Sequence, residues 1–414
     1  MSNETLVIKF GGTSVGDGAA FRRAAKIAAD EAKDRPAAVV VSAMSGVTDT
    51  LLGHAETTER MTGRITTGTT REDSTREDSL TELHNTLATR HLQAAKEAVS
   101  KEIFPRVEER ILHLLERLLE EIEDGSKDAE ERAAEVATRG ERLSAEILAG
   151  AITSLGVEAA VAEDPIVMDS EFGEAEICSD RTRERCSSNV APLLEAGVIS
   201  VVPGYVGRSP EGRVTTLGRG GSDLSATALG RAVGASEVWI MTDVDGVLSA
   251  DPRLVPDASL MSKLSYREAR IFAELGAKVL HHKTMEPVSG AGIPVRVANT
   301  FDPGRPGTRV SDIEDGRGVR CVALRHGLRF EVPCANGRKK EAAMVVCVGS
   351  PGADDLSLGR RSLTEAGIPL LHSGAAPAGL VFSVSAEYGE EALRTLHGSL
   401  VVGTEETLDG EAVA

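Results

Sequence analysis

Short apolar segments alternate with amphipathic ones over most of the chain. Residues 5–10 (TLVIKF) and 37–43 (AAVVVSA) are apolar and bounded by turn formers, which is typical of buried strands. Between them, FRRAAKIAADEAKD (21–34) spaces its apolar side chains as one face of a helix does. Strand, glycine-rich turn, helix and strand in this order predict a parallel α/β sheet. Further strands are predicted over residues 157–162, 198–207, 236–244 and 293–298.

A second pattern, strongly helical and rich in Glu and Arg, extends from residue 80 to residue 152. The preceding stretch, 56–79, is polar and contains the sequence TREDS twice in tandem, from Thr70 to Ser79. Because this stretch is polar and carries a local duplication, it is predicted to be a mobile surface loop.

The α/β pattern ends at FDPGRPGT (301–308), a segment rich in Gly and Pro. The residues after it follow the order strand, helix, strand, helix, which predicts a small α+β module. A chain of 414 residues is long enough for two such domains. We therefore predict one domain over residues 1–312 and a second over residues 313–414.

Composition narrows the possible partners. The net charge of −18 argues against nucleic acid, because a phosphate backbone would be repelled. The chain starts with a polar segment and contains no apolar run of about 18 residues, so neither a signal peptide nor a membrane span is predicted. The five cysteines lack metal-binding spacing and are expected to be reduced thiols. We expect a cytoplasmic protein.

The first candidate motif is KFGGTS (9–14), where a predicted strand passes into a helix. The adjacent glycines Gly11 and Gly12 would let backbone N–H groups approach a phosphate, and Lys9 could neutralise a transferring phosphoryl group. The alternative is a simple turn with an exposed lysine. The motif is neither a P-loop nor a dinucleotide-binding fingerprint.

The second motif is LGRGGSD (217–223), in which glycines surround an arginine before a predicted helix. Arg219 is suited to bidentate capture of a carboxylate, and Ser222 or Asp223 could cap the helix. Capping alone is the alternative for Asp223, but it leaves the glycines around the arginine unexplained.

The third motif is MTDVDGV (241–247), which ends a predicted strand in polar residues and is followed by DPR (251–253). Ligands usually bind at the carboxyl edge of a parallel sheet. An ordinary Asp-Gly turn is the alternative. The segment GAKVLH (276–281) lies on a predicted helix, and the alternative for Lys278 is a solvated surface lysine.

Two weaker signals remain. SAMSGVT (42–48) ends the second strand in small hydroxyl residues, and GERLS (140–144) places a glycine and Glu141 inside a helical region. The alternative for Glu141 is a surface acid.

Together and in this order, these segments resemble the aspartokinases, members of the amino-acid kinase family, over about residues 5–312. The sequences that carry the resemblance are KFGGTSVGD, VVSAMSGVTD, GERLSAE, PGYVG, TTLGRGGSD, TDVDGVLSADPR and GAKVLH. The resemblance implies an α/β fold, with a three-layer αβα kinase domain and a mainly parallel sheet that binds MgATP and L-aspartate.

The resemblance also implies roles for individual residues. The catalytic pair would be Lys9, on the transferring phosphate, and Asp223, which would position the lysine. Residues that would bind the amino acid are Thr48, Glu141, Tyr205, Arg219 and Ser222. Residues that would bind the nucleotide are Lys9, Gly11, Gly12, Ser42, Thr242, Asp243, Arg253 and Lys278.

The implied activity is transfer of the γ-phosphoryl group of ATP, with Mg²⁺, to the β-carboxylate of L-aspartate. This reaction is the first step toward lysine, threonine and methionine. A free carboxyl group titrates near pH 4, so the nucleophile is already ionised and no general base is needed. Two alternatives stay open: a kinase for another amino acid, and a non-catalytic amino-acid sensor.

The tail matches the family less well. Aspartokinases usually end in two ACT modules, which bind feedback amino acids and mediate dimerisation. Here residues 342–402 resemble one module, and residues 318–335 resemble only an opening strand or hairpin of another. We expect an ACT-like module that forms a homodimer or higher homo-oligomer, with weak or absent feedback inhibition.

Overall fold

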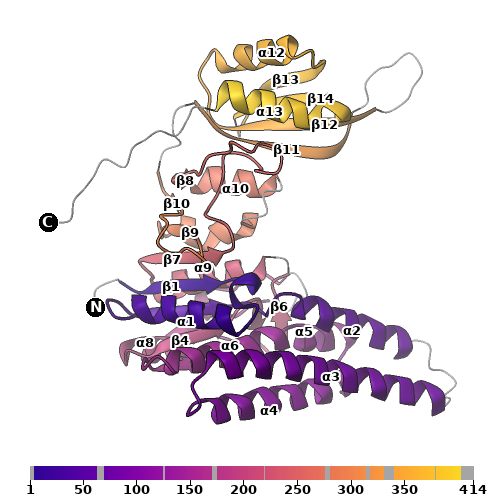
Figure 1. Ribbon diagram of the computed structural model, residues 1–414, viewed down its shortest axis with the longest axis vertical. Helices are drawn as coiled ribbons and strands as arrows, with labels where there is room; N and C mark the ends of the chain where they lie inside the picture. Colours follow the sequence, from indigo (N-terminus) through magenta and orange to yellow (C-terminus); the bar gives the residue numbers. More distant parts are fainter. Residues whose placement is uncertain are drawn as a thin grey trace. The chain divides into compact units, whose positions relative to one another are not determined.

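The computed structural model describes residues 4–62, 70–124, 126–169, 175–218, 220–275, 280–313, 318–330, 340–377 and 379–401 (Figure 1). The chain divides into two compact units, which we call the first and the second unit. The first unit comprises Met1–Asp243 and Glu286–Arg305, and the second comprises Val244–Met285 and Pro306–Ala414.

This division differs from the predicted boundary after residue 312. Residues 244–285 belong to the second unit because their helix α10 (Tyr266–Glu274) contacts strand β12 (Lys340–Ser350) of the C-terminal module.

Among its described residues, the first unit contains six parallel strands, as the alternating pattern predicts. Neighbouring strands pair in the order β3-β4-β2-β1-β7-β9. Their bounds are β1 (Leu6–Phe10), β2 (Ala37–Val41), β3 (Ala159–Val161), β4 (Ile199–Pro203), β7 (Glu237–Thr242) and β9 (Val295–Asn299). All five residues of β1 are buried, which requires that both faces of this central strand are covered.

Helices cover the two faces of this sheet. On one face, α1 (Gly18–Glu31) and α6 (Arg139–Thr153) share a hydrophobic core with Leu6, Ile8 and Phe10. On the other face lies α9 (Gly221–Val233), whose Gly230 is so close to Val238 of β7 that a Cβ would be 2.5 Å from that side chain. Helix, sheet and helix form the three layers that the family resemblance implies.

The prediction of a surface loop over residues 56–79 is wrong where the structure describes it. Helix α2 (Val47–Thr62) ends in this stretch, and helix α3 (Thr70–Ala98) begins with the TREDS repeat. The repeat contains neither Gly nor Pro, and it continues into a segment whose Leu80, Leu83 and Leu87 are buried. Because Arg and Glu are good helix formers, this anchored segment extends into the polar repeat. Helices α3 and α6 both contact α4 (Phe104–Glu123) (Figure 1).

A second correction concerns the strand predicted over residues 198–207. It is interrupted after β4, and the chain resumes as β5 (Val206–Arg208), which pairs with β6 (Val214–Thr216) in an antiparallel hairpin. The interruption falls at Tyr205, whose φ of 68° lies in the left-handed region and breaks an extended strand. The remaining elements of this unit are η1 (Gly12–Val15), α5 (Ala129–Ala137), α7 (Ser179–Asn189), α8 (Ala191–Glu195) and α11 (Glu286–Ser289).

The second unit contains the predicted α+β module. Its antiparallel sheet has the order β11-β12-β14-β13 and two helices, α12 (Asp355–Glu365) and α13 (Gly389–Leu400). The outer strands are β11 (Gly318–Phe330) and β13 (Leu370–Ala376), and β14 is Gly379–Ser385. The sequence pattern predicts no strand at β13, because His, Ser, Gly and Ala give this edge strand no apolar alternation. The unit also has η2 (His282–Met285) and the parallel strands β8 (Lys263–Ser265) and β10 (Thr308–Ser311).

Within the described part of the chain, no helix has both the length and the apolar character needed to cross a membrane.

Candidate active site

A cavity of about 750 Å³ opens in the first unit where β1, β2 and β7 end. Because these strands are parallel, the residues that follow them meet at one edge of the sheet. Eleven of the predicted site residues line this cavity: Lys9, Gly11, Gly12, Ser42, Thr48, Glu141, Tyr205, Ser222, Asp223, Thr242 and Asp243. Segments that are more than two hundred residues apart in the sequence therefore share one cavity, a spatial proximity that the spacing of the motifs could not establish.

One wall of the cavity carries a buried ion pair. Lys9 Nζ lies 2.5 Å from Asp223 Oδ1, and Lys9 is only 8% exposed. Helix α9 has Gly220 as its N-cap residue. Asp223 is therefore not the N-cap residue, which was the alternative interpretation of the motif. Lys9 is likewise not the exposed lysine of a simple turn. The pair fixes a positive charge at the carboxyl end of the central strand.

The two glycines after Lys9 keep the space beside its ammonium group open. A Cβ on Gly11 would lie 3.3 Å from Lys9 Nζ, and a Cβ on Gly12 would lie 3.0 Å from the carbonyl oxygen of Ala43. Side chains at these two positions would crowd the lysine and the backbone around it. The turn therefore has room for a ligand to approach the main chain closely.

The glycines of the second motif shape the opposite turn. Gly218 and Gly220 have φ angles of 70° and 76°, in the left-handed region that favours glycine. Gly221 packs against Tyr205, because a Cβ on this glycine would be 2.8 Å from the Tyr205 ring. Arg219, between the first two glycines, lies outside the described residues.

Glu141 lies at the start of α6 and is 3% exposed, so it is not the surface acid of the alternative interpretation. Burial raises the pKa of its carboxyl group to about 8, although backbone N–H groups of Glu141 and Ala43 and the charge of Arg142 act in the opposite direction. Among the described residues, Glu141 Oε2 has no hydrogen-bond partner. A buried carboxyl group at a cavity, with one oxygen lacking a partner among the described residues, is suited to receive a cation from a ligand.

Tyr205 lies beside Glu141 in a strained conformation. Its backbone N–H donates a hydrogen bond to Ser225 Oγ at 3.0 Å, which helps to hold the φ of 68°. Burial raises the pKa of the Tyr205 hydroxyl; a hydrogen bond with Thr216 opposes this rise, and the Glu141 charge adds to it. Strain of this kind persists where surrounding contacts impose it, and it is common at functional sites.

Further residues line the cavity that were given no individual role from the sequence, although most of them lie inside the quoted motifs. They are Thr13, Ala43, Met44, Ser45, Gly46, Asp49, Leu52, Gly218, Gly220 and Gly221. A signal existed for Leu52, which follows Thr48 by four residues in α2 and so lies on the same face of the helix.

Two predicted nucleotide contacts are not placed in this cavity. Lys278 lies outside the described residues. Arg253 belongs to the second unit, where its Nε and Nη2 lie 3.0 and 2.5 Å from the carboxylate of Asp251. It lines a different, mostly apolar cavity of about 300 Å³. The nucleotide roles of Arg253 and Lys278 stay predictions.

Comparison with known proteins identifies the fold that carries this cavity. The model of the amino acid kinase family matches residues 4–299, which include every predicted site residue. The chain belongs to the amino acid kinase family. The sequence relatives of this amino acid kinase are aspartokinases, so it groups with them inside the family.

Two of these relatives show the extent of the similarity. The lysine-sensitive aspartokinase 3 of Escherichia coli is 34% identical over 331 residues, which cover 78% of this kinase and 68% of the relative. The chloroplastic aspartokinase 2 of Arabidopsis thaliana is 32% identical over 316 residues, which cover 75% of this kinase but only 55% of the relative. This kinase therefore spans about half to two thirds of their length.

A solved structure extends the similarity to the fold. The crystal structure of E. coli aspartokinase III in complex with aspartate and ADP matches with a TM-score of 0.75 and 25% sequence identity. The match covers 96% of this kinase and 99% of that chain.

Proposed function

We propose that this amino acid kinase phosphorylates the β-carboxylate of L-aspartate with ATP and so forms 4-phospho-L-aspartate. The observation that carries the proposal is a single cavity with the buried Lys9–Asp223 ion pair on one wall and the buried carboxyl group of Glu141 on another; among the described residues, Glu141 Oε2 has no hydrogen-bond partner. The first suits the phosphate of a nucleotide, and the second suits the ammonium group of an amino acid.

The amino acid would bind through charges at both of its ends. Glu141 would receive the α-ammonium group, and Arg219 would bind the α-carboxylate, as the family resemblance implies. Thr48, Tyr205 and Ser222 would surround the side chain. A free amino acid fits a carboxylate better than an N-acylated one, which would offer no cation to Glu141. Binding of aspartate by the E. coli relative supports this arrangement.

The nucleotide would bind with its terminal phosphate at Lys9, Gly11 and Gly12. Lys9 would neutralise charge on the transferring phosphoryl group, and Asp223 would hold the lysine in position. Ser42, Thr242 and Asp243 line the same cavity and would contact the nucleotide. Arg253 and Lys278 are proposed to complete the nucleotide site.

Mg²⁺ would enter this site together with ATP. Within the described part of the chain, no group of three or more His, Cys, Asp or Glu residues could hold a metal ion. Mg²⁺ commonly takes phosphate oxygens, waters and only one or two carboxylates as ligands, so the acidic residues of the cavity fit an ion that arrives on the nucleotide. When bound, it would screen the negative charge of the phosphates.

Catalysis by this arrangement needs no proton transfer at the nucleophile. The β-carboxylate of aspartate is ionised at neutral pH, so the protein has to align two anions and reduce their repulsion. Lys9 and the backbone N–H groups of the glycine turn would do so in a largely buried site, where electrostatic interactions are strong.

The family resemblance also supports proposals for the C-terminal region. The α+β module would be ACT-like, within a domain of residues 313–414 that follows a kinase domain of residues 1–312, and it would join copies of the chain into a homodimer or larger homo-oligomer. Feedback inhibition would be weak or absent. Strong inhibition of the purified protein by millimolar lysine or threonine would contradict this last proposal.

The activity is tested by measuring ADP release from MgATP with L-aspartate and, separately, with L-glutamate. We expect release with aspartate alone, together with an acyl phosphate that hydroxylamine traps as a hydroxamate. Lys9→Ala should abolish turnover. Lys26→Ala is the matched control, because Lys26 also pairs with an aspartate but is 72% exposed and lies on the surface of α1. Full turnover in Lys9→Ala, or no hydroxamate from the unmodified protein, would refute the proposal.

A further inference from the structure

Behind the amino-acid side of the cavity lies a buried acid that no motif contains. Asp164 follows β3, is 1% exposed and has a φ of 43°, a left-handed conformation that Asp tolerates better than most residues. Its carboxylate does not line the cavity. A buried charge in an unfavourable backbone conformation needs compensation from its surroundings.

Two arginines supply that compensation. Arg142 Nη2 and Arg208 Nε each lie 2.8 Å from the same oxygen, Asp164 Oδ2. Burial alone would raise the pKa of Asp164, but the charges and hydrogen bonds of the two arginines outweigh it and lower that pKa. The acid is therefore ionised at neutral pH and balances one of the two positive charges that contact it.

Each arginine lies close in sequence to a residue that lines the cavity. Arg142 directly follows Glu141 in α6. Arg208 ends β5, the strand that begins immediately after Tyr205. One carboxylate thus connects the helix that carries Glu141 with the strand that follows Tyr205.

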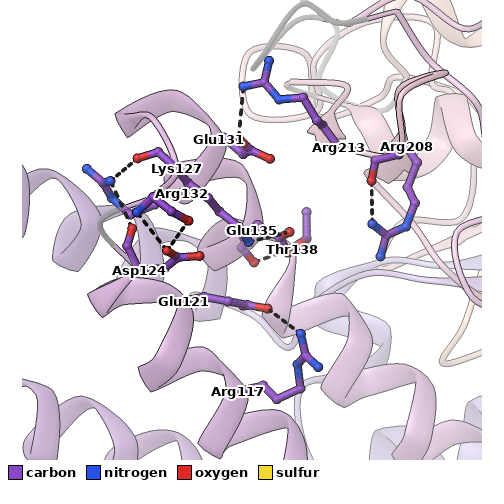
Figure 2. Close-up of polar contacts among 12 residues, drawn as sticks. Arg117, Glu121, Asp124, Lys127, Glu131, Arg132, Glu135, Thr138, Arg208 and Arg213 are labelled. Atoms are coloured by element: carbon purple, nitrogen blue, oxygen red, sulfur yellow. Dashed lines mark hydrogen bonds and ion pairs between the residues drawn. The ribbon is translucent and has the colours of Figure 1, made fainter.

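Backbone contacts attach the Asp164 loop to the same strand. The N–H of Arg208 donates to the carbonyl of Ile166 at 3.0 Å, and the N–H of Met168 donates to the carbonyl of Arg208 at 3.0 Å. Arg208 Nη1 also donates to the carbonyl of Gly212 at 2.8 Å, within the β5–β6 hairpin. At the tip of this hairpin, Arg213 pairs with Glu131 of α5 (Figure 2). The turn end of the hairpin is therefore held twice, by α5 through Arg213 and by Asp164 through Arg208.

The ion pair with Asp164 also holds the Arg142 guanidinium away from the Glu141 carboxyl group. Arg142 is a partly buried cation next in sequence to Glu141, and its charge already influences the Glu141 carboxyl group. With its guanidinium bound to Asp164, Arg142 leaves Glu141 Oε2 without a cation among the described residues. An Arg142 released from Asp164 would compete with the substrate for this carboxyl group.

We propose that Asp164 is a positioning residue of the amino-acid site: it fixes α6 against β5 through Arg142 and Arg208, and it keeps Arg142 away from Glu141. The inference rests on the proposed function, since it takes Glu141 as the receptor of the substrate ammonium group. Asp164 acts only through the arginines and does not touch the substrate.

The test compares Asp164→Asn with the unmodified protein in steady-state kinetics. We expect the KM for L-aspartate to rise about tenfold or more, because small displacements of a binding group cost large factors in rate or affinity. The kcat and the KM for ATP should stay within about twofold, since the Lys9 wall of the cavity is unchanged. Isothermal titration of the protein with L-aspartate should show the same loss of affinity without turnover.

Glu121→Gln is the matched control. Glu121 pairs with Arg139, so this ion pair also anchors the start of α6 and is also buried, but its partner helix α4 contributes nothing to the cavity. We expect a lower melting temperature in both variants and a raised KM for L-aspartate only in Asp164→Asn. A second variant, Asp164→Asn with Arg142→Gln, should regain part of the affinity for aspartate, because the competing cation is gone.

The possible outcomes distinguish a failure of this inference from a failure of the proposed function. If the unmodified protein neither binds nor phosphorylates aspartate, the proposed function fails and the inference fails with it. If the unmodified protein is active and Asp164→Asn keeps its KM for aspartate, or loses affinity for both substrates alike, only the inference is overturned. Should Asp164→Asn not fold, Arg208→Gln replaces it, because Arg208 is 31% exposed and its loss leaves the Asp164–Arg142 pair intact. There, a raised KM for aspartate alone supports the inference, and an unchanged one overturns it.

Discussion

In the proposed site, the buried carboxyl group of Glu141 would make the binding of L-aspartate depend on pH. Its pKa lies at about 8 instead of the usual 4.5, and desolvation is the main cause. The empty site therefore holds a proton on Glu141 until the pH rises through about 8. At pH 7, roughly one molecule in ten has the ionised carboxylate that an ammonium group needs.

The expected result follows from this population. The kcat/KM for L-aspartate reports the free enzyme, so it should rise about tenfold per pH unit between pH 6 and pH 8 and then level off. The nucleophilic β-carboxylate is ionised throughout this range and cannot cause the rise. The kcat/KM for ATP, measured at saturating aspartate, should not show the same dependence, because Glu141 is then occupied.

Glu141→Gln removes the titrating group and preserves its size. At pH 8.5 the variant should lose about 3 kcal/mol of binding, or roughly a hundredfold in kcat/KM for L-aspartate, because a buried charge pair loses one member. Its pH profile should be flat. Glu146→Gln is the matched control, since Glu146 lies on the same helix but does not line the cavity. A wild-type profile that is flat from pH 6 to pH 8, or a Glu141→Gln variant that binds aspartate normally, would refute the reasoning.

Three further substitutions test other parts of the structure. Gly12→Ala should raise the KM for ATP about tenfold in steady-state kinetics, because its Cβ would lie 3.0 Å from the Ala43 carbonyl and displace the turn; an unchanged KM would contradict this. Gly230→Ala should cost about 1–3 kcal/mol in denaturant unfolding, since its Cβ would lie 2.5 Å from Val238; unaltered stability would show that α9 can shift freely. Ser265→Ala breaks the capping box of α10 and should cost about 1 kcal/mol in the same experiment.

Local sequence carried enough information for the central sheet and for the residue types of the site. Apolar runs such as β1 and β2 are expected in any buried parallel sheet. Glycines such as those after Lys9 are expected wherever a backbone leaves room for a phosphate. The burial of Glu141 could not be predicted in this way. It depends on Gly140, whose missing side chain lets α6 approach Ala43 and Val47 so closely that a Cβ would lie 2.7 and 2.9 Å from their side chains. This contact joins segments about ninety residues apart, and no local pattern reports it.

The Asp164 cluster was missed for a related reason. Asp164, Arg142 and Arg208 are ordinary charged residues in sequence, and only the fold brings all three together and excludes water from the acid. The TREDS repeat shows the opposite error, because a polar composition suggested a loop although the repeat lacks any residue that breaks a helix. A polar composition therefore does not by itself indicate a loop.

The Lys9–Asp223 pair has a consequence for how the protein is assembled during synthesis. The ribosome synthesises Lys9 long before Asp223. Strands β1 and β2 can therefore form before the Lys9 ammonium group has its counter-ion. Contacts of such long range form slowly in folding. A nascent chain truncated before α9 therefore lacks the Lys9–Asp223 pair, and formation of this pair marks the time at which α9 packs against β1.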